Sequence, residues 1–326
     1  MLKQFESISD IESMWSSLLA KSNTDTIFLT PLWESVWWNH FSKGKTWHGL
    51  YLEKNRQIVG IAPMWSTGDT LSLIGNTETV DYNDFIILPE YAEEFLNSVV
   101  DHFIISNNNY LNLYSIHENS QTKTLLPKIA KEKGLTINIT EEDVSPGIIL
   151  PNTWDDFLAG LNKKDRHELR RKLRRLDTVE NCVVQVIDDS DKLDEYFSIF
   201  IKLMKMSRTE KESYLDIEKE SYFKSIFEIA ADNKYLKLFL MSIDGTYASA
   251  SLCFDYKGKR LLYNSGNNHD FDYYSVGLLL HSLAIKDAIN NNFKYFDFLR
   301  GDEQYKYKLG GSNKQVYTLE VSKNDQ

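Results

Sequence analysis

Hydrophobic and polar positions follow the same order of patterns in both halves of the 326-residue chain. Each half begins with two alternating segments around a turn, continues with helical spacing, and ends with an asparagine-rich turn and a further strand. The segments are 48–65, 91–106 and 110–116 in the first half and 237–254, 275–290 and 293–299 in the second. A nearly constant offset separates the matching segments, which favours a structural duplication, with coincidence of a common pattern as the alternative.

A polar stretch near the middle of the chain marks the expected boundary, because it contains the turn-forming pair Pro146-Gly147. A short strand over 148–150 and a new helix at Trp154 follow it. The sequence therefore predicts an α/β protein of two domains, 1–146 and 147–326, each with a mixed sheet flanked by helices.

Composition limits the class of protein. The chain is 42% hydrophobic with a formal net charge of −10, so it can bury a core, and its acidity argues against a general nucleic-acid coat protein. No apolar run approaches a membrane span, and the start resembles no secretory leader. Two cysteines, Cys182 and Cys253, fit neither a metal site nor a disulfide framework, and the seven histidines show no ligand spacing. We expect a cytoplasmic protein without metal.

One segment departs from this acidity. Residues 163–175 hold eight Lys or Arg side chains against Asp165 and Glu168. The leucines from Leu158 to Leu176 form one apolar stripe on a helix or on a helix pair. The basic face has three interpretations: a solvated face, a contact to the phosphates of a donor or to an anionic acceptor, or a docking surface for RNA or anionic lipid.

The second half carries the candidate chemistry. A strand, a polar loop and the helix start Ser275-Val276-Gly277 form a potential anion site with Ser275 as N-cap, although any capped helix has this pattern. Asp297 lies in an aromatic strand, on the face opposite Phe296 and Phe298. It is interpreted either as an ion-pair partner of Arg300 or as a residue that orients a nucleophile or accepts its proton.

Two further lysines follow this strand. Lys306 and Lys308 would share one face of an extended segment, where they suit a phosphate or a developing oxyanion. The alternative is a pair of exposed lysines.

These motifs resemble those of the CelD/BcsL-type acyltransferases of the GNAT superfamily (the BioF2-like acetyltransferase domain), which are related to the Fem-type peptidyltransferases. The similarity lies in the helix start Ser275-Val276-Gly277, the strand end Asp297-Phe298-Leu299-Arg300-Gly301-Asp302, the pair Tyr305-Lys306 and the basic segment 162–176. Thr30-Pro31-Leu32-Trp33 near the start is also similar. Val276 departs from the family pattern, in which proline is usual.

The resemblance implies two tandem GNAT-like domains, the second holding the donor and the first shaping the acceptor side. Acyl-CoA, with acetyl-CoA as the expected donor, would be bound by Ser275, Gly277, Arg300 and Lys308. The implied catalytic residues are Asp297, Lys306 and Tyr263, and the implied acceptor residues are Asp81, Tyr82 and Asp84, whose acidic groups would suit an amine.

The expected function is transfer of an acyl group from acyl-CoA to an amine of a small sugar or amino-acid-like acceptor, in cell-surface polysaccharide or natural-product biosynthesis. The first alternative is a Fem-type transferase that uses aminoacyl-tRNA. The second is a non-catalytic scaffold that docks to RNA or to a membrane. Under the main hypothesis, nucleic acid is not a partner.

Overall fold

The computed structural model describes residues 2–188, 191–207 and 215–324, which divide into two compact units. Unit 1 comprises residues 1–144 and 314–326, and unit 2 comprises residues 145–313. The last thirteen residues, expected in the second domain, therefore belong to unit 1. They do so because the strand they contain pairs with strands of that unit.

Unit 1 contains a mixed sheet of eight strands in the order β1-β2-β3-β4-β6-β14-β7, with β5 on β3. Its strands are β1 (Leu2–Phe5), β2 (Thr46–Lys54), β3 (Gln57–Thr67), β4 (Thr70–Leu73), β5 (Ile86–Ile87), β6 (Tyr110–His117), β7 (Thr136–Val144) and β14 (Gln315–Ser322). Its α-helices are α1 (Glu12–Leu19), α2 (Pro31–Phe41), α3 (Ala92–Ile105) and α4 (Gln121–Glu132).

Unit 2 contains a second mixed sheet, with six strands in the order β8-β13-β12-β11-β10-β9. The strands are β8 (Gly147–Ile149), β9 (Cys182–Ile187), β10 (Leu236–Ile243), β11 (Thr246–Tyr256), β12 (Lys259–Asn267) and β13 (Tyr295–Asp297). The described α-helices are α5 (Trp154–Gly160), α6 (Lys163–Leu176), α7 (Leu193–Ser207), α9 (Ile217–Asp232), α10 (Val276–Asn290) and α11 (Gln304–Lys308).

The two sheets repeat one plan, as the sequence pattern predicts. Three antiparallel strands lead to one parallel pair, β4 with β6 in unit 1 and β12 with β13 in unit 2. The backbone even repeats a left-handed residue, Ser115 in β6 at φ 59° and Leu299 after β13 at φ 57°. Tight turns with positive φ at Asn55-Arg56, Asp244-Gly245 and Lys257-Gly258 join the hairpin strands.

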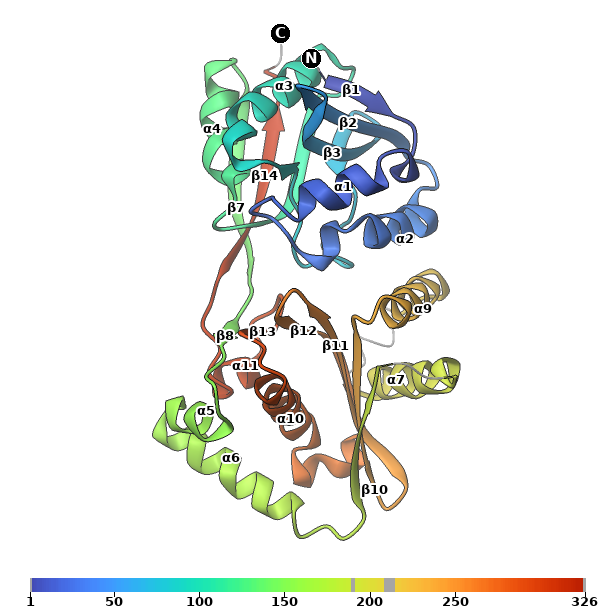
Figure 1. Cartoon of the computed structure of the whole chain (residues 1–326), viewed down its shortest axis with the longest axis vertical. Coiled ribbons are helices and arrows are strands. Elements are labelled where there is room, and N and C mark those ends of the chain that lie inside the picture. Colours follow the sequence, from blue (N-terminus) through green and yellow to red (C-terminus); the bar gives the residue numbers. More distant parts are fainter. Residues whose placement is uncertain (1, 189–190, 208–214, 325–326) are drawn as a thin grey trace. The chain divides into compact units, whose positions relative to one another are not determined.

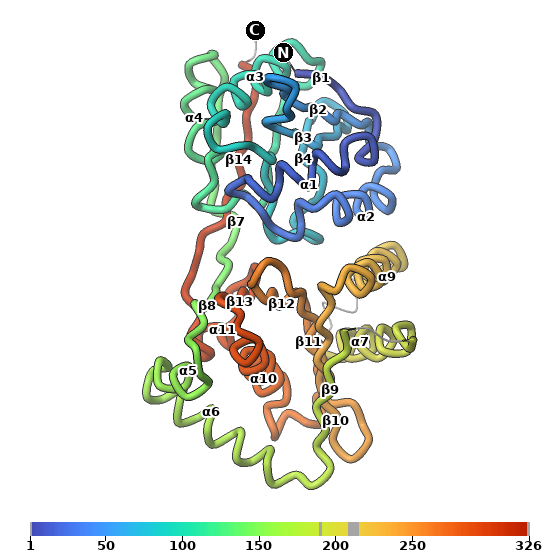
Figure 2. The backbone as a smooth tube through the Cα atoms, viewed as in Figure 1, coloured from blue at the N-terminus to red at the C-terminus, as the bar shows by residue number. Residues whose placement is uncertain are grey.

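Each unit completes its sheet with a strand from a distant part of the chain. The chain leaves unit 1 after β7, adds β8 beside β13, and returns at the end to insert β14 between β6 and β7. In Figure 1 the red β14 consequently lies among blue and green strands. Figure 2 traces the two chain segments that make these crossings.

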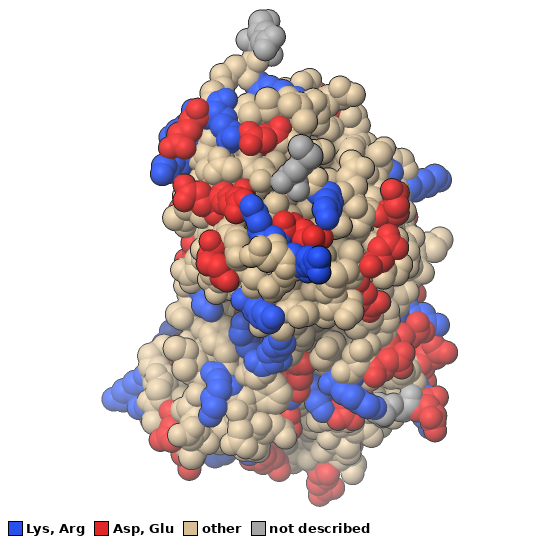
Figure 3. Space-filling model, turned by 45° about the horizontal axis from the view of Figure 1, so that its top comes forward, with Lys and Arg blue, Asp and Glu red and all other residues tan. Residues whose placement is uncertain are grey.

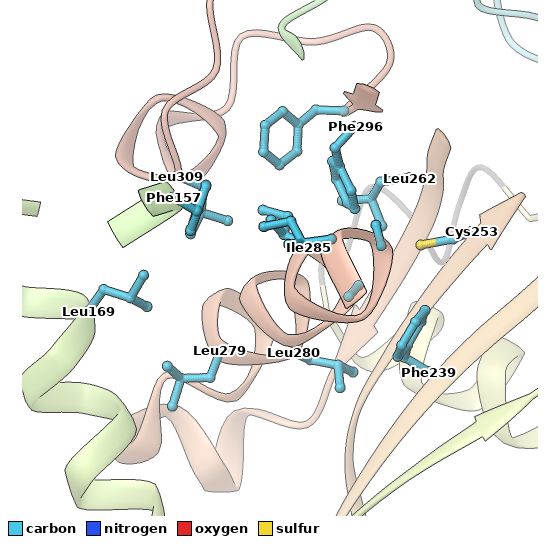
Figure 4. Packing of buried hydrophobic residues seen from close by; sticks show 14 of the residues in the cluster. Phe157, Leu169, Phe239, Cys253, Leu262, Leu279, Leu280, Ile285, Phe296 and Leu309 are labelled. Atoms are coloured by element: carbon cyan, nitrogen blue, oxygen red, sulfur yellow. The ribbon is translucent and has the colours of Figure 1, made fainter. Parts of the chain in front are cut away.

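In unit 2, α10 covers one face of the sheet and α7 and α9 cover the other (Figure 1). Neighbouring residues of β12 show this division: Leu262 belongs to the core under α10, and the ring of Tyr263 contacts Phe223 of α9. Figure 4 shows how α10 is surrounded, with its Leu279, Leu280 and Ile285 near Leu169, Phe239, Phe296 and Leu309. This packing fixes the start of α10 against α6 and the sheet.

The leucine stripe of the basic segment belongs to two helices, because α5 ends at Gly160 and α6 begins at Lys163 with Asn162 as its N-cap. Leu169 and Leu176 are buried in the core of unit 2, which leaves the basic face outward. No helix in the described part of the chain is both long and apolar enough to span a bilayer.

Candidate functional site

The parallel strands β12 and β13 separate toward their C-terminal ends, at the edge of the unit 2 sheet where the strands terminate. Pairing extends only from Lys259–Tyr295 to Leu261–Asp297, whereas β12 itself continues to Asn267. Beyond Leu261, β12 has no ladder partner on the β13 side among the described residues. Because the strands are parallel, both of their C-terminal ends lie at this edge, and η4 (His269–Tyr274) carries the chain from β12 into α10 here.

The start of α10 differs from the expected N-cap. Ser275 has a left-handed backbone (φ 57°), and its side chain makes no capping hydrogen bond. Its Oγ instead accepts a 2.6 Å hydrogen bond from Lys172 Nζ of α6. The first helical hydrogen bond runs from Leu279 N to the Ser275 carbonyl, so the amides of residues 276–278 point out of the helix end. This end is therefore electropositive and carries an ammonium group beside it.

Gly277 allows close packing in this first turn. A Cβ at this position would lie 2.7 Å from both Nδ2 and Oδ1 of Asn267. The Asn267 side chain cannot easily yield, because its Oδ1 accepts a 2.7 Å hydrogen bond from the buried Ser249 hydroxyl. Glycine thus lets the helix end approach the last residue of β12.

Lys308 joins the same cluster from α11. It lines a cavity of about 10 Å³, room for one water, together with Glu168 and Leu278. Glu168 lies 3.3 Å from Lys172, and this ion pair lowers the pKa of the Glu168 carboxyl, with smaller contributions from Lys308 and Arg171. Lys172, Lys308 and the α10 start are thus brought together, and the carboxylates of Glu168 and of Asp165, which lines the same cavity, offset part of their charge.

Asp297 and Tyr263 lie on the face of the sheet opposite α10. Phe296 and Phe298 belong to the α10 core, so the alternation predicted for this strand is confirmed. Asp297 is buried, and its Oδ1 accepts a 2.9 Å hydrogen bond from the Leu299 amide. Its strand partner is Leu261, two residues before Tyr263, so both side chains lie where the ladder ends.

Lys306 does not have the expected geometry. The segment that holds it is the short helix α11, not an extended strand, and Lys306 is 2% exposed. Its Nζ donates to the carbonyls of Leu299, Arg300 and Gly301 at 2.8–3.0 Å and lies 3.0 Å from Glu303 Oε2.

These partners occupy the ammonium, so in this structure Lys306 holds the loop after β13 instead of facing a donor. The loop needs such support because Leu299 and Gly301 both have positive φ. Arg300 is half-buried in the same loop.

The acceptor candidates of unit 1 are not grouped on an open surface. Asp84 is buried and lies against the start of α4. It accepts hydrogen bonds from the hydroxyls of Ser120 and Thr122 of that helix start and from the Phe85 amide. Burial raises its pKa to about 6, against the opposing effect of these hydrogen bonds.

Tyr82 is also buried, with its ring against Phe28 and His117, and only Asp81 is half-exposed. Asp84 and Tyr82 are therefore better explained as structural residues of unit 1.

Lys172 is one of the eight basic residues of segment 163–175, and no pattern in the sequence assigns it a role of its own. Its partner Ser275 is distant in sequence, so no local spacing connects them; only the i, i+4 relation to Glu168 shows in the sequence. On the face drawn in Figure 3, basic and acidic side chains are interspersed. The outward face of α6 is an exception, because Lys163, Arg170 and Arg174 are exposed without an acidic partner among the described residues.

Comparison with protein-family models shows which kind of domain unit 2 resembles. Residues 163–307 match the model of an acetyltransferase (GNAT) domain. This range begins at α6 and ends in α11, so it includes β12, β13 and the start of α10. No curated protein matches the sequence.

Solved structures of similar fold span both units. The crystal structure of FemX has a TM-score of 0.68 at 12% identity, over 98% of this chain and 96% of that chain. The C-terminal domain of a putative lysylphosphatidylglycerol synthetase from Agrobacterium fabrum has 0.60 at 10%, over 98% and 93%. A tandem GNAT protein from the clavulanic acid biosynthesis pathway has 0.55 at 10%, over 100% of both chains. At these identities the likeness establishes the fold: two tandem GNAT-like units.

Proposed function

We propose that this chain is an acyltransferase that moves an acyl group, with acetyl as the first candidate, from acyl-CoA to an amine. The observation that carries the proposal is the coincidence of two features at one sheet edge. The strands β12 and β13 separate there, and α10 begins there with free amides beside Lys172. The match of this region to a GNAT domain supports it.

The helix start supplies the phosphate site of the proposal. A diphosphate would accept hydrogen bonds from the amides of residues 276–278 and from Lys172, which would exchange the Ser275 hydroxyl for a phosphate oxygen. Lys308, which lines a cavity together with Leu278, would add positive charge near this helix end. Gly277 keeps the amides close to the sheet, so the donor arm can pass from the helix end toward the separated strands.

The reaction itself would be direct attack. The neutral amine adds to the thioester carbonyl carbon, the C–S bond breaks, and the departing sulfur takes up a proton while the amine loses one. Tyr263 carries a hydroxyl close to the point where the strands separate. We propose that this hydroxyl donates the proton that the departing sulfur takes up. The buried Asp297, whose Oδ1 accepts a hydrogen bond from the Leu299 amide at the end of β13, would help to position the acceptor on this face of the sheet. We further propose that the acceptor amine belongs to a small sugar or to an amino-acid-like molecule.

Calorimetric titration with acetyl-CoA and with CoA tests the donor. We expect Lys172→Met to weaken acetyl-CoA binding by tenfold or more, because a charge-assisted hydrogen bond contributes about 1.5–3 kcal/mol. Lys164→Met is the matched control, because Lys164 is an exposed lysine of the same helix. Absence of binding to the wild-type protein at millimolar concentration would overturn the proposal.

A second candidate function rests on the outward face of α6. Lys163, His167, Arg170 and Arg174 follow one line along that helix, and the three Lys and Arg side chains are exposed without acidic partners among the described residues. Such a line suits RNA, as a transferase using aminoacyl-tRNA would require, and FemX has the same fold. Steep loss of tRNA affinity with rising salt, together with no affinity for acetyl-CoA, would favour this function.

A further inference from the structure

Tyr273 is an exposed aromatic ring that its neighbours hold in place. It lies at the end of η4 with 68% of its surface exposed. The guanidinium of Arg175 lies 4.4 Å from the ring centre, and its Nη1 donates a 2.6 Å hydrogen bond to the Tyr273 carbonyl. The ring of Tyr274 meets it edge-on at 5.1 Å. An aromatic ring that is fixed but exposed offers a stacking surface with little ordering cost.

This ring stands beside the proposed phosphate site. Tyr273 is two residues before Ser275, whose hydroxyl binds Lys172. Lys172 and Arg175 are three residues apart on α6, so they are neighbours on one side of that helix, separated by about 4.5 Å along its axis. A ligand whose diphosphate lies at Lys172 would therefore bring its next group to Tyr273.

A further cation lies one helical turn from Arg175 on α6. Arg171 is four residues before Arg175 on the same helix, is exposed, and has no ion pair among the described residues. The nearby acids have other partners: Glu168 pairs with Lys172, and Asp272 pairs with His269. Arg171 is therefore available to a phosphate beside the stacked ring.

We propose that Tyr273 and Arg175 form the subsite for the adenine ring of the donor, and that Arg171 binds its 3′-phosphate. This inference rests on the proposed function and adds the residues that would hold the nucleotide end of its donor. The donor would be a free nucleotide thioester, acyl-CoA, and not a phosphopantetheine arm attached to a carrier protein. The adenine would stack on the exposed face of Tyr273, with Arg175 keeping the ring in position from the protein side.

Donors shortened one group at a time test the subsite. Dissociation constants would be measured for acetyl-CoA, acetyl-dephospho-CoA, which lacks the 3′-phosphate, and S-acetyl-4′-phosphopantetheine, which lacks the nucleotide. Stacking of a base contributes about 1–3 kcal/mol, so Tyr273→Ala should weaken acetyl-CoA binding about 5- to 150-fold. It should leave the affinity for acetyl-phosphopantetheine unchanged. Arg171→Met should weaken binding of acetyl-CoA but not of acetyl-dephospho-CoA.

Tyr110→Ala is the matched control, because Tyr110 is an exposed tyrosine of unit 1. Tyr273 is exposed, so its alanine variant should melt within about 2 °C of wild type, consistent with small effects of surface substitutions.

Equal weakening of the full and the shortened donors by Tyr273→Ala would overturn the subsite. Equal wild-type affinity for acetyl-CoA and acetyl-phosphopantetheine would also overturn it, and the acyltransferase proposal would stand. If the wild-type protein binds none of the three donors, the proposed function and the subsite both fail.

Discussion

Lys306 offers the sharpest test of how the strand end is held. Lys306→Met removes an ammonium with three carbonyl partners at 2.8–3.0 Å and a carboxylate at 3.0 Å, while it nearly preserves side-chain volume. Each charge-assisted hydrogen bond contributes about 1.5–3 kcal/mol, but the released desolvation cost of the ammonium offsets part of that sum. We expect a net loss of about 3–5 kcal/mol, the range observed when one partner of a buried charge pair is removed.

The expected loss is large enough to measure by calorimetry. In a domain of this size 1 kcal/mol corresponds to about 2–4 °C, so the melting temperature of unit 2 should fall by about 6–20 °C. Lys308→Met is the control, because Lys308 is two residues away on the same helix but exposed, and its replacement should cost at most about 0.5 kcal/mol.

Wild-type melting in Lys306→Met would refute this reasoning. If Lys306→Met melted like wild type but lost turnover, the ammonium of Lys306 in the wild-type protein would have to act on a substrate in another conformation of the loop. A similar drop in melting temperature for Lys308→Met would equally contradict the argument, since it would show that any change in α11 destabilises the unit.

Three other predictions concern buried charges. Arg260 is fully buried and pairs with Asp255 at 2.7 Å and Asp287 at 2.6 Å, so Arg260→Met should cost about 3–5 kcal/mol in urea unfolding, and a loss under 1 kcal/mol would contradict its role. Asp84 binds its proton more tightly in the folded state, with a pKa of about 6 against 3.8, so this carboxyl should reduce stability by about 3 kcal/mol as pH rises from below 4 to above 6. Asp84→Asn should abolish that part of the pH profile, and an unchanged profile would be inconsistent with the shift. Glu34 is buried, neither carboxyl oxygen has a hydrogen-bond partner among the described residues, and burial raises its pKa well above the usual value, so Glu34→Met should stabilise the protein by about 1–3 kcal/mol at pH 8, measured by thermal unfolding against wild type.

The fold was largely predictable because its elements carry local patterns. Glycine and asparagine turns placed the hairpins, and the period of the apolar positions placed α3 and α10 within a residue or two. The repeated offset also indicated that the two sheets share a plan. The pairing of β8 and β14 was not predictable, because each strand pairs with residues far away in the sequence and no local pattern states its partner.

The site was predictable in its location but not in its roles. The start of α10 and the strand with Asp297 were singled out, and the structure brings them to one sheet edge. The local geometry of Ser275 and Lys306 was not predictable because it depends on tertiary partners. Ser275 takes a left-handed backbone and binds Lys172, and Lys306 turns inward to three carbonyls.

The return of β14 to unit 1 also has a consequence for synthesis on the ribosome. Residues up to β7 emerge first, but the sheet of unit 1 lacks its strand between β6 and β7 until β14 has been made, after the whole of unit 2. During that interval β6 exposes an unpaired edge, the kind of edge that promotes aggregation. Unit 2 has all of its strands as soon as β13 emerges, because β8 precedes it. The half of the molecule that is translated first is therefore completed last, and its folding depends on the nascent chain staying soluble until the end.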